Sequence, residues 1–233
     1  MATMNFPQAQ RSVRDELVHA AVRLLNDEGP DALQTRKIAG AAGTSTMALY
    51  THFGGMRALI AGLAEEGLRQ FADALTVPET SDPVADLVAT GIAYRRFALE
   101  HPHMYRLMFG STSAHGINAP AHNVVSLSVA EISEHYPSFA RVVRPVHRSM
   151  VAGRITAGSA DDDASVVAIA AQFWAAIHGF VMLELAGYCG DGGAAVGPVL
   201  AGMTTNLLVA LGDSRERVEE SQRLAIREAP GTP

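Results

Sequence analysis

The sequence contains a single cysteine, Cys189, in 233 residues. One thiol forms no internal disulfide and no two-cysteine metal or redox motif, which excludes disulfide-rich secreted domains and cysteine-based zinc sites. The stretch from Met1 to Gln10 contains no apolar run, which predicts that the chain carries no signal peptide. The two absences together predict a protein of the reducing cytoplasm.

Charged and aromatic residues are scarce, at 18% and 6%, and Lys37 is the only lysine. Apolar residues reach 48%, which is enough for one or two domains with a real core and too many for a disordered chain. The most apolar stretch, 164–189, is interrupted by Gln172, His178 and Glu184. Its uninterrupted runs fall short of the ~20 residues that a membrane span needs, so we expect a buried or subunit-interface helix.

Helical periodicity recurs along the chain, whereas no stretch alternates with the period of two that is typical of strands. From Val13 to Leu25 the apolar residues follow helical spacing, and Gly29-Pro30 marks an end. We therefore predict an all-α fold, with a three-helix N-terminal domain over 11–71 and a C-terminal helical bundle over 83–212. Between them lies the proline-containing connector 76–82, and a charged segment over 215–228 is expected to be a frayed helix.

The segment Thr35–Phe53, TRKIAGAAGTSTMALYTHF, is the most informative about function. Ala39 and Gly43 provide a small residue and a residue that tolerates positive φ, where two helices cross closely through a tight turn. The second helix would then expose a face that fits a major groove of about 12 Å. That face consists of Ser45, Thr46, Met47, Tyr50 and Thr51. An ordinary helical hairpin with a glycine turn is the alternative that these residue types leave open.

The ending Leu49–Phe53, LYTHF, makes this segment resemble the N-terminal domain of the TetR family of bacterial transcriptional regulators. The resemblance covers about residues 11–71, including AAVRLLNDEG before the segment and RALIAGL after it. In that family a first helix packs on a helix-turn-helix that ends in a Tyr-x-His-Phe-type motif. The resemblance therefore implies a DNA-binding transcriptional regulator.

The resemblance also implies roles for single side chains. Contacts to DNA phosphates, which set register and not sequence preference, are expected from Thr35, Tyr50 and His52. Contacts to base edges are expected from Ser45, Thr46, Met47 and Ala48. The family usually has a lysine three residues after Phe53, where this sequence has Met56. That phosphate contact is therefore either absent or made by Arg57.

Charge is divided unevenly along the chain. Residues 1–60 hold six basic and five acidic residues, whereas the remainder is net −7 and the whole chain net −6. The acidic remainder is not expected to face DNA. Because the N-terminal excess is small, Arg36, Lys37 and Arg57 would have to act through their placement.

The C-terminal part resembles, more weakly, TetR-family domains named for a Trp-His-Gly motif, here Trp174, His178 and Gly179. This resemblance implies a helical domain for effector binding and dimerisation. Because aromatic and methionine residues cluster in 94–109 and 173–182, we expect an apolar effector pocket there. Its expected lining is Tyr94, Phe97, Met104, Met108, Phe109, Trp174 and His178. Plain core packing is the alternative for each of these side chains.

Histidines raise the question of a metal site, since six of the nine lie in or near the middle of the chain: His101, His103, His115, His122, His135 and His147. Their spacings match no common ligand pattern. The sequence also lacks the nucleophile, metalloprotease, phosphate-loop and dinucleotide motifs of enzymes. We therefore expect no bound metal, no cofactor and no catalytic site.

These observations predict a homodimeric repressor that binds palindromic double-stranded operator DNA and leaves it when a small, largely apolar effector binds. The helices at 164–189 and 196–211 carry more apolar surface than one core needs, which predicts a four-helix dimer interface. Two alternatives remain open. One is an all-α small-molecule-binding protein or enzyme without DNA binding, and the other is a TetR-type activator.

Overall fold

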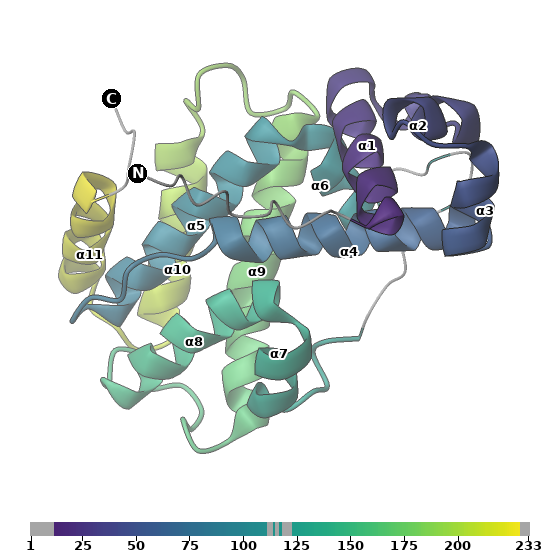
Figure 1. Ribbon diagram of the computed structural model, residues 1–233. Helices are drawn as coiled ribbons and strands as arrows, with labels where there is room; N and C mark the ends of the chain where they lie inside the picture. The colour runs from purple at the N-terminus through teal and green to yellow at the C-terminus, as the bar shows by residue number, and fades with distance from the viewer. Residues whose placement is uncertain (1–11, 111–113, 115–116, 118–122, 229–233) are drawn as a thin grey trace, which may run out of the picture. The chain divides into compact units, whose positions relative to one another are not determined.

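The computed structural model describes residues 12–110, 114, 117 and 123–228. Arg11, the first residue of the predicted N-terminal domain, lies outside the described residues, as does most of the loop after Gly110. The described residues form helices and no strand (Figure 1), so the all-α prediction is confirmed for them. The chain divides into two compact units, residues 1–68 with 101–121 and residues 69–100 with 122–233.

The first unit is built from five helices and the N-terminal part of a sixth. They are α1 (Val13–Glu28), η1 (Pro30–Ala32), α2 (Thr35–Ala41), α3 (Thr46–Phe53), α6 (Pro102–Met108) and α4 (Met56–Ala74) up to Leu68. The Ser12 hydroxyl caps α1 by accepting a hydrogen bond from the backbone N–H of Asp15 at 3.2 Å. Along α1, Leu17, Ala21 and Leu25 are buried, so one apolar face packs into the core of this unit.

Helix α6 belongs to the first unit, although the sequence boundaries placed it in the C-terminal domain. It packs against α1, and it approaches α4 at Gly67. A Cβ atom at Gly67 would lie 2.5 Å from the Met104 sulfur and 2.7 Å from the Met108 sulfur. The missing side chain thus makes room for both methionines, and this local packing explains why the units alternate along the chain.

The second unit is a helical bundle centred on α9 (Asp163–Leu185). The other helices are α5 (Pro83–Glu100), α7 (Val129–His135), α8 (Pro137–Val151), η2 (Val196–Ala201), α10 (Gly202–Ala210) and α11 (Arg215–Glu228). Helix α5 packs against α8, α9 and α11, and α8 packs against α9. Among the described residues, α9 is the one helix that is long and apolar enough to cross a membrane by length and composition. Its Val166, Ile169 and Phe173 are instead buried in the core of the bundle.

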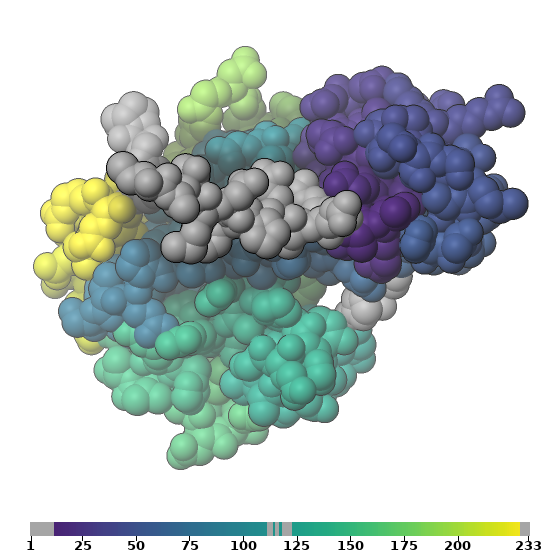
Figure 2. All heavy atoms as spheres, in the orientation of Figure 1, coloured from purple at the N-terminus to yellow at the C-terminus, as the bar shows by residue number. Residues whose placement is uncertain are grey.

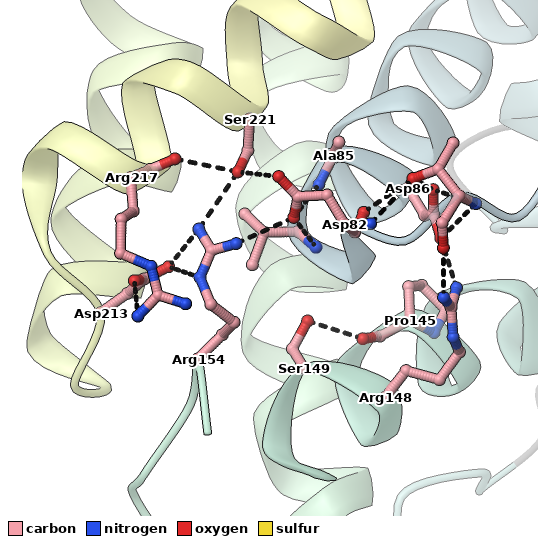
Figure 3. A network of polar contacts seen from close by, with 12 residues as sticks. Asp82, Ala85, Asp86, Pro145, Arg148, Ser149, Arg154, Asp213, Arg217 and Ser221 are labelled. Atoms are coloured by element: carbon pink, nitrogen blue, oxygen red, sulfur yellow. Dashed lines mark hydrogen bonds and ion pairs between the residues drawn. The ribbon is translucent and has the colours of Figure 1, made fainter. Parts of the chain in front are cut away.

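Helix α11 is fixed to the bundle by a buried polar cluster around Arg154 (Figure 3). The Arg154 guanidinium donates to the carboxylate of Asp213 at 2.8 Å, to that of Asp82 at 2.9 Å and to the hydroxyl of Ser221 at 3.1 Å. Ser221 in turn donates to Asp82 at 2.6 Å. Because Ser221 lies on α11 and Asp82 precedes α5, the cluster ties these two helices together. The expectation of a frayed helix over 215–228 is therefore wrong, since Val218, Ser221 and Ala225 are buried.

A second ion pair holds the connector before α5. Arg148 of α8 pairs with the buried carboxylate of Asp86 and donates to the backbone carbonyl of Thr80 at 2.6 Å. Asp86 also accepts hydrogen bonds from the backbone N–H and hydroxyl of Thr80. Helix α8 thereby fixes the residues through which the chain enters α5.

Candidate nucleic-acid interface and ligand cavity

The turn between α2 and α3 has the conformation that the sequence requires of it. Gly43 has a φ of 65°, in the left-handed region that glycine adopts without steric cost. Its N–H donates to the carbonyl of Gly40 at 3.1 Å, and the N–H of Thr44 donates to the carbonyl of Ala39 at 2.9 Å. These bonds close the end of α2 and turn the chain into α3 within a few residues.

Small and aliphatic side chains hold α2 and α3 together against α1. Ile38 and Ala39 of α2 and Leu49 of α3 are buried, and α1 packs against both helices. The Arg23 guanidinium of α1 donates to the carbonyl of Ala41 at 3.3 Å, which satisfies a backbone group at the end of α2. Leu49 is the one fully buried residue of α3, so the remaining faces of this short helix stay accessible.

Helix α3 presents large side chains to solvent. Met47 is 71% exposed and Tyr50 is 52% exposed, and Thr46, Thr51 and His52 are exposed beside them. The atoms of α2 and α3, drawn indigo to blue, lie at the surface in the space-filling view (Figure 2). The Ser45 hydroxyl caps the helix by accepting from the N–H of Ala48 at 3.2 Å, and Ala48 is half-buried. Exposed apolar and aromatic side chains on one helix face indicate a surface that meets a partner.

Basic side chains flank α3 at both ends of the helix-turn-helix. Arg36 and Lys37 are exposed on the first turn of α2, which begins at the half-buried Thr35. Lys37 pairs with Glu28, but both side chains are more than 40% exposed, so this pair contributes little and is exchangeable. After α3, Met56 is half-buried whereas Arg57 is exposed. The family usually has a lysine at the position of Met56. Here the neighbouring Arg57 is the side chain that reaches solvent.

The second unit contains a cavity of about 600 Å³. Its walls come from α5, α8, α9, η2, α10 and α11, and their apolar contributions include Leu87, Tyr94, Phe173, Ile177, Leu200 and Ile226. This size and this mostly apolar lining are typical of sites for small organic molecules.

Of the seven residues predicted to line an effector pocket, Tyr94 lines this cavity. Trp174 and His178 lie on the neighbouring face of α9. The Trp174 ring packs 5.3 Å from that of Phe139, and the Tyr94 hydroxyl lies 3.3 Å from His178 Nδ1. Burial lowers the pKa of His178 below its ordinary 6.5, so the ring is neutral at pH 7.

The other four predicted pocket residues lie elsewhere. Phe97 packs on Phe71 of α4, with the ring centroids 5.0 Å apart. Met104, Met108 and Phe109 belong to the first unit, where the two methionines surround Gly67. The seven residues therefore do not form one pocket: Tyr94 lines the cavity, Trp174 and His178 lie on the neighbouring face of α9, and the other four pack elsewhere.

Sequence reasoning missed most of the cavity lining, including Phe173 and Ile177. These residues immediately precede Trp174 and His178, so one step along α9 separates the two faces. Because α9 is apolar on every side, its sequence does not indicate which face of the helix lines a cavity. Gln222 and Ile226 of α11 were missed because that segment was expected to be frayed.

Metal ligands were not expected, and in the ranges that the structure describes no group of three His, Cys, Asp or Glu side chains is arranged to hold a metal ion. His115 and His122 lie outside those ranges. His103 packs against Gly29 in the first unit.

Two family models match the chain. The model described as "Bacterial regulatory proteins, tetR family" matches residues 17–63, which include the helix-turn-helix. The model described as "Tetracyclin repressor-like, C-terminal domain" matches residues 87–207, which is more than half of the chain. The C-terminal match is thus to a tetracycline-repressor-like domain, and nothing in it bears on the Trp-His-Gly subtype.

Individual relatives agree with these matches. Tetracycline repressor protein class C of Escherichia coli is 33% identical over 101 residues, which are 43% of this chain and 46% of that protein. The chain therefore matches less than half the length of this repressor. An HTH-type transcriptional regulator of Mycobacterium tuberculosis is 25% identical over 183 residues, which are 76% of this chain and 72% of that protein.

Solved structures share the fold over nearly the whole chain. A protein from Rhodococcus sp. RHA1 is 28% identical and superposes with a TM-score of 0.64, covering 90% of this chain and 100% of its own. RolR in complex with resorcinol, at 15% identity, shows the same fold with a TM-score of 0.61 and covers 95% of this chain and 96% of its own. With the helix-turn-helix geometry and both family matches in agreement, the chain belongs to the TetR family of bacterial transcriptional regulators.

Proposed function

We propose that the chain is a cytoplasmic homodimeric repressor, not an enzyme, whose two α3 helices read the half-sites of a palindromic operator. A small molecule in the cavity of the second unit would release the DNA. The observation that carries the proposal is the face of α3, where Thr46, Met47, Tyr50 and Thr51 are all exposed on a helix anchored by Leu49. A short rigid helix of this kind fits the major groove.

We infer the roles on the DNA from membership of the family and from the chemistry of the side chains. Tyr50, His52 and Thr35 would bind phosphates and set the register of the helix. Thr46, Met47, Ala48 and Ser45 would contact base edges, where the methionine and alanine side chains suit a thymine methyl group. Arg36, Lys37 and Arg57 would supply charge at the rim, and the rest of the chain, at net −7, would face away from the duplex.

Dimerisation is supported by apolar surface on α9 and on the η2–α10 segment. Leu183, Val199, Met203 and Val209 are exposed there. Ala168, Ala175 and Gly179 of α9 are exposed at helical spacing, and such small residues allow close approach of a second helix. Pairing these helices between two subunits forms a four-helix interface that would bury this surface.

Coupling between ligand binding and DNA binding is supported by a series of side-chain contacts inside the second unit. Tyr94 lines the cavity, and its ring packs edge-on against Phe71 of α4 at 4.8 Å. Helix α4 is continuous from Met56 to Ala74, and in this proposal a shift at Phe71 would be passed along it toward Met56. A ligand that favours one position of α5 would then change the spacing of the two α3 helices.

The test is selection of bound sequences from a random DNA pool by the full chain, followed by fluorescence anisotropy on the selected duplex. A palindromic site bound by the wild type and lost on Tyr50→Ala supports the proposal. Recovery of no preferred sequence would contradict it and favour a helical small-molecule-binding protein or enzyme without DNA binding. Transcription of the selected target in cells lacking the chain separates a repressor, where it rises, from an activator, where it falls.

A further inference from the structure

The polar groups around the cavity differ in charge and in the hydrogen bonds that they can still make to a ligand. Most of the lining is aliphatic or aromatic, so the few polar side chains decide which molecules are accepted. They are Thr90, Arg95, Arg96, Glu100, Thr204 and Gln222, with the hydroxyl of Tyr94. The inference below rests on the proposed function of this cavity as the effector site.

Charge around the cavity is balanced. The Arg95 guanidinium makes two hydrogen bonds to the carboxylate of Glu184, at 2.8 and 2.6 Å, and the Glu184 side chain is buried. Arg96 and Glu100, at the exposed end of α5, are four residues apart and carry opposite charges. The four ionisable groups therefore sum to zero. An ionic ligand would lose its hydration without gaining an uncompensated opposite charge, which is unfavourable.

The hydroxyl donors of the two threonines in the lining are already used. The hydroxyl of Thr90 donates to the backbone carbonyl of Asp86 at 2.9 Å. The hydroxyl of Thr204 donates to the carbonyl of Leu200, also at 2.9 Å. Each hydroxyl oxygen keeps a lone pair, so what these residues have left is the capacity to accept.

Gln222 extends this pattern. Its amide nitrogen donates to the carbonyl of Ala201 at 3.2 Å and to the hydroxyl oxygen of Thr205 at 3.0 Å. The carbonyl of Ala201 accepts only, which fixes the side of the amide that carries the nitrogen. The amide oxygen accepts no hydrogen bond from the part of the chain that the structure describes. Gln222 lines the cavity, and its amide oxygen is the acceptor that this residue still has to offer.

We propose that the cavity selects uncharged, largely apolar molecules that carry a hydroxyl or N–H donor, and that the Gln222 amide oxygen accepts this donor. Gln222 is then the residue that distinguishes a ligand from an analogue of the same shape without the donor. Specificity of this kind arises because the unpaired buried donor or acceptor of a mismatched pair costs free energy.

Matched probes test the proposed chemical class of the ligand directly, by isothermal titration calorimetry on the full chain without DNA. One set is estradiol, its 3,17-dimethyl ether and its 3-sulfate, and a smaller set is 4-phenylphenol, 4-methoxybiphenyl and biphenyl-4-carboxylate. In at least one set the alcohol should bind about tenfold more tightly than the ether, and the anion should bind more weakly than the alcohol. Equal binding of alcohol and ether, tightest binding of the anion, or no binding of either alcohol would overturn the proposal.

Variants assign the preference to Gln222. Gln222→Met keeps the length of the side chain but lacks the acceptor, so the alcohol and the ether should bind it equally. Thr205→Val is the matched control, because it removes a hydrogen-bond partner of the Gln222 amide nitrogen while leaving the amide oxygen in place. The control should keep the preference for the alcohol. Loss of that preference in both variants, or in neither, would contradict a specific role of the Gln222 oxygen.

DNA release, measured with the same probes on the selected duplex, separates this inference from the proposed function. An alcohol that binds the chain without weakening DNA binding contradicts the effector role but leaves the ligand class standing. A sulfate or carboxylate that binds and releases DNA contradicts the ligand class but supports the effector role.

Discussion

At the scale of single residues, the exposed side chains of α3 divide into two groups that mutation should distinguish. Tyr50→Phe and His52→Ala should weaken binding to every duplex by a similar factor, since phosphate contacts carry no sequence information. Met47→Ala and Thr46→Ala should instead change which bases are preferred, by about 1–3 kcal/mol at the affected position. Anisotropy titrations against the selected duplex and single-base variants measure both effects. Identical profiles for all four variants would mean that α3 does not lie in the groove.

A phosphate contact of Arg57 can be tested quantitatively through the salt dependence of DNA binding. If its guanidinium contacts a phosphate, Arg57→Ala should reduce the slope of log K against log salt by about 0.9. Its neighbour Met56 is half-buried and uncharged, so Met56→Ala serves as the control and should leave the slope unchanged. An unchanged slope in Arg57→Ala would leave the usual family contact without a replacement in this chain.

His178 should make stability depend on pH. Burial lowers its pKa in the folded state, so its contribution is fully present above the ordinary value of 6.5 and is lost as the pH falls through the folded pKa. Denaturant titrations from pH 7.5 to 5 should show this loss in the wild type. His178→Gln, which cannot be protonated, should show a smaller loss over the same range. Equal pH dependence of the two chains would contradict the assignment.

At the scale of elements, the Arg154 cluster should hold α11 to the bundle. Arg154→Ala leaves the carboxylate of Asp213, which is 0% exposed, without its main partner, and breaking such a buried pair costs about 3–5 kcal/mol. Arg144→Ala is the matched control, because Arg144 pairs with Glu79 at the surface and should contribute at most about 1 kcal/mol. Denaturant unfolding of the full chain measures the difference. Similar losses of unfolding free energy in the two variants would show that the cluster does not hold α11 to the bundle.

The elements also differ in how far the sequence predicts them. The helix-turn-helix was predictable because its signals are local: Gly43 for the turn, Ser45 for the cap and Leu49 for the buried anchor all lie within a few residues. The packing of α6 in the first unit was not, because it depends on Gly67 meeting Met104 across more than thirty residues. The order of α11 likewise comes from Arg154, a partner that lies far away in the sequence.

At the scale of the whole molecule, the exposed apolar face of α9 and α10 should make the chain a dimer. Sedimentation should give twice the chain mass of 24.6 kDa. Leu183→Glu, on that face, should shift the population to monomer and weaken binding to the palindrome. Val151→Glu alters an apolar residue at the end of α8 that is even more exposed than Leu183, and it should leave the dimer intact. A wild-type monomer at micromolar concentration would contradict the proposed interface.

The Arg154 cluster also sets an order of events during protein synthesis. Asp213 and Ser221 follow Arg154 by 59 and 67 residues. At about 5–20 residues per second, a ribosome delivers these partners roughly 3–13 seconds after Arg154 itself. Until then Arg154 can pair with Asp82, which is made earlier, but not with the fully buried carboxylate of Asp213. The first unit, in contrast, ends at residue 121. A newly made chain therefore completes the unit that carries the helix-turn-helix several seconds before it completes the unit that contains the cavity.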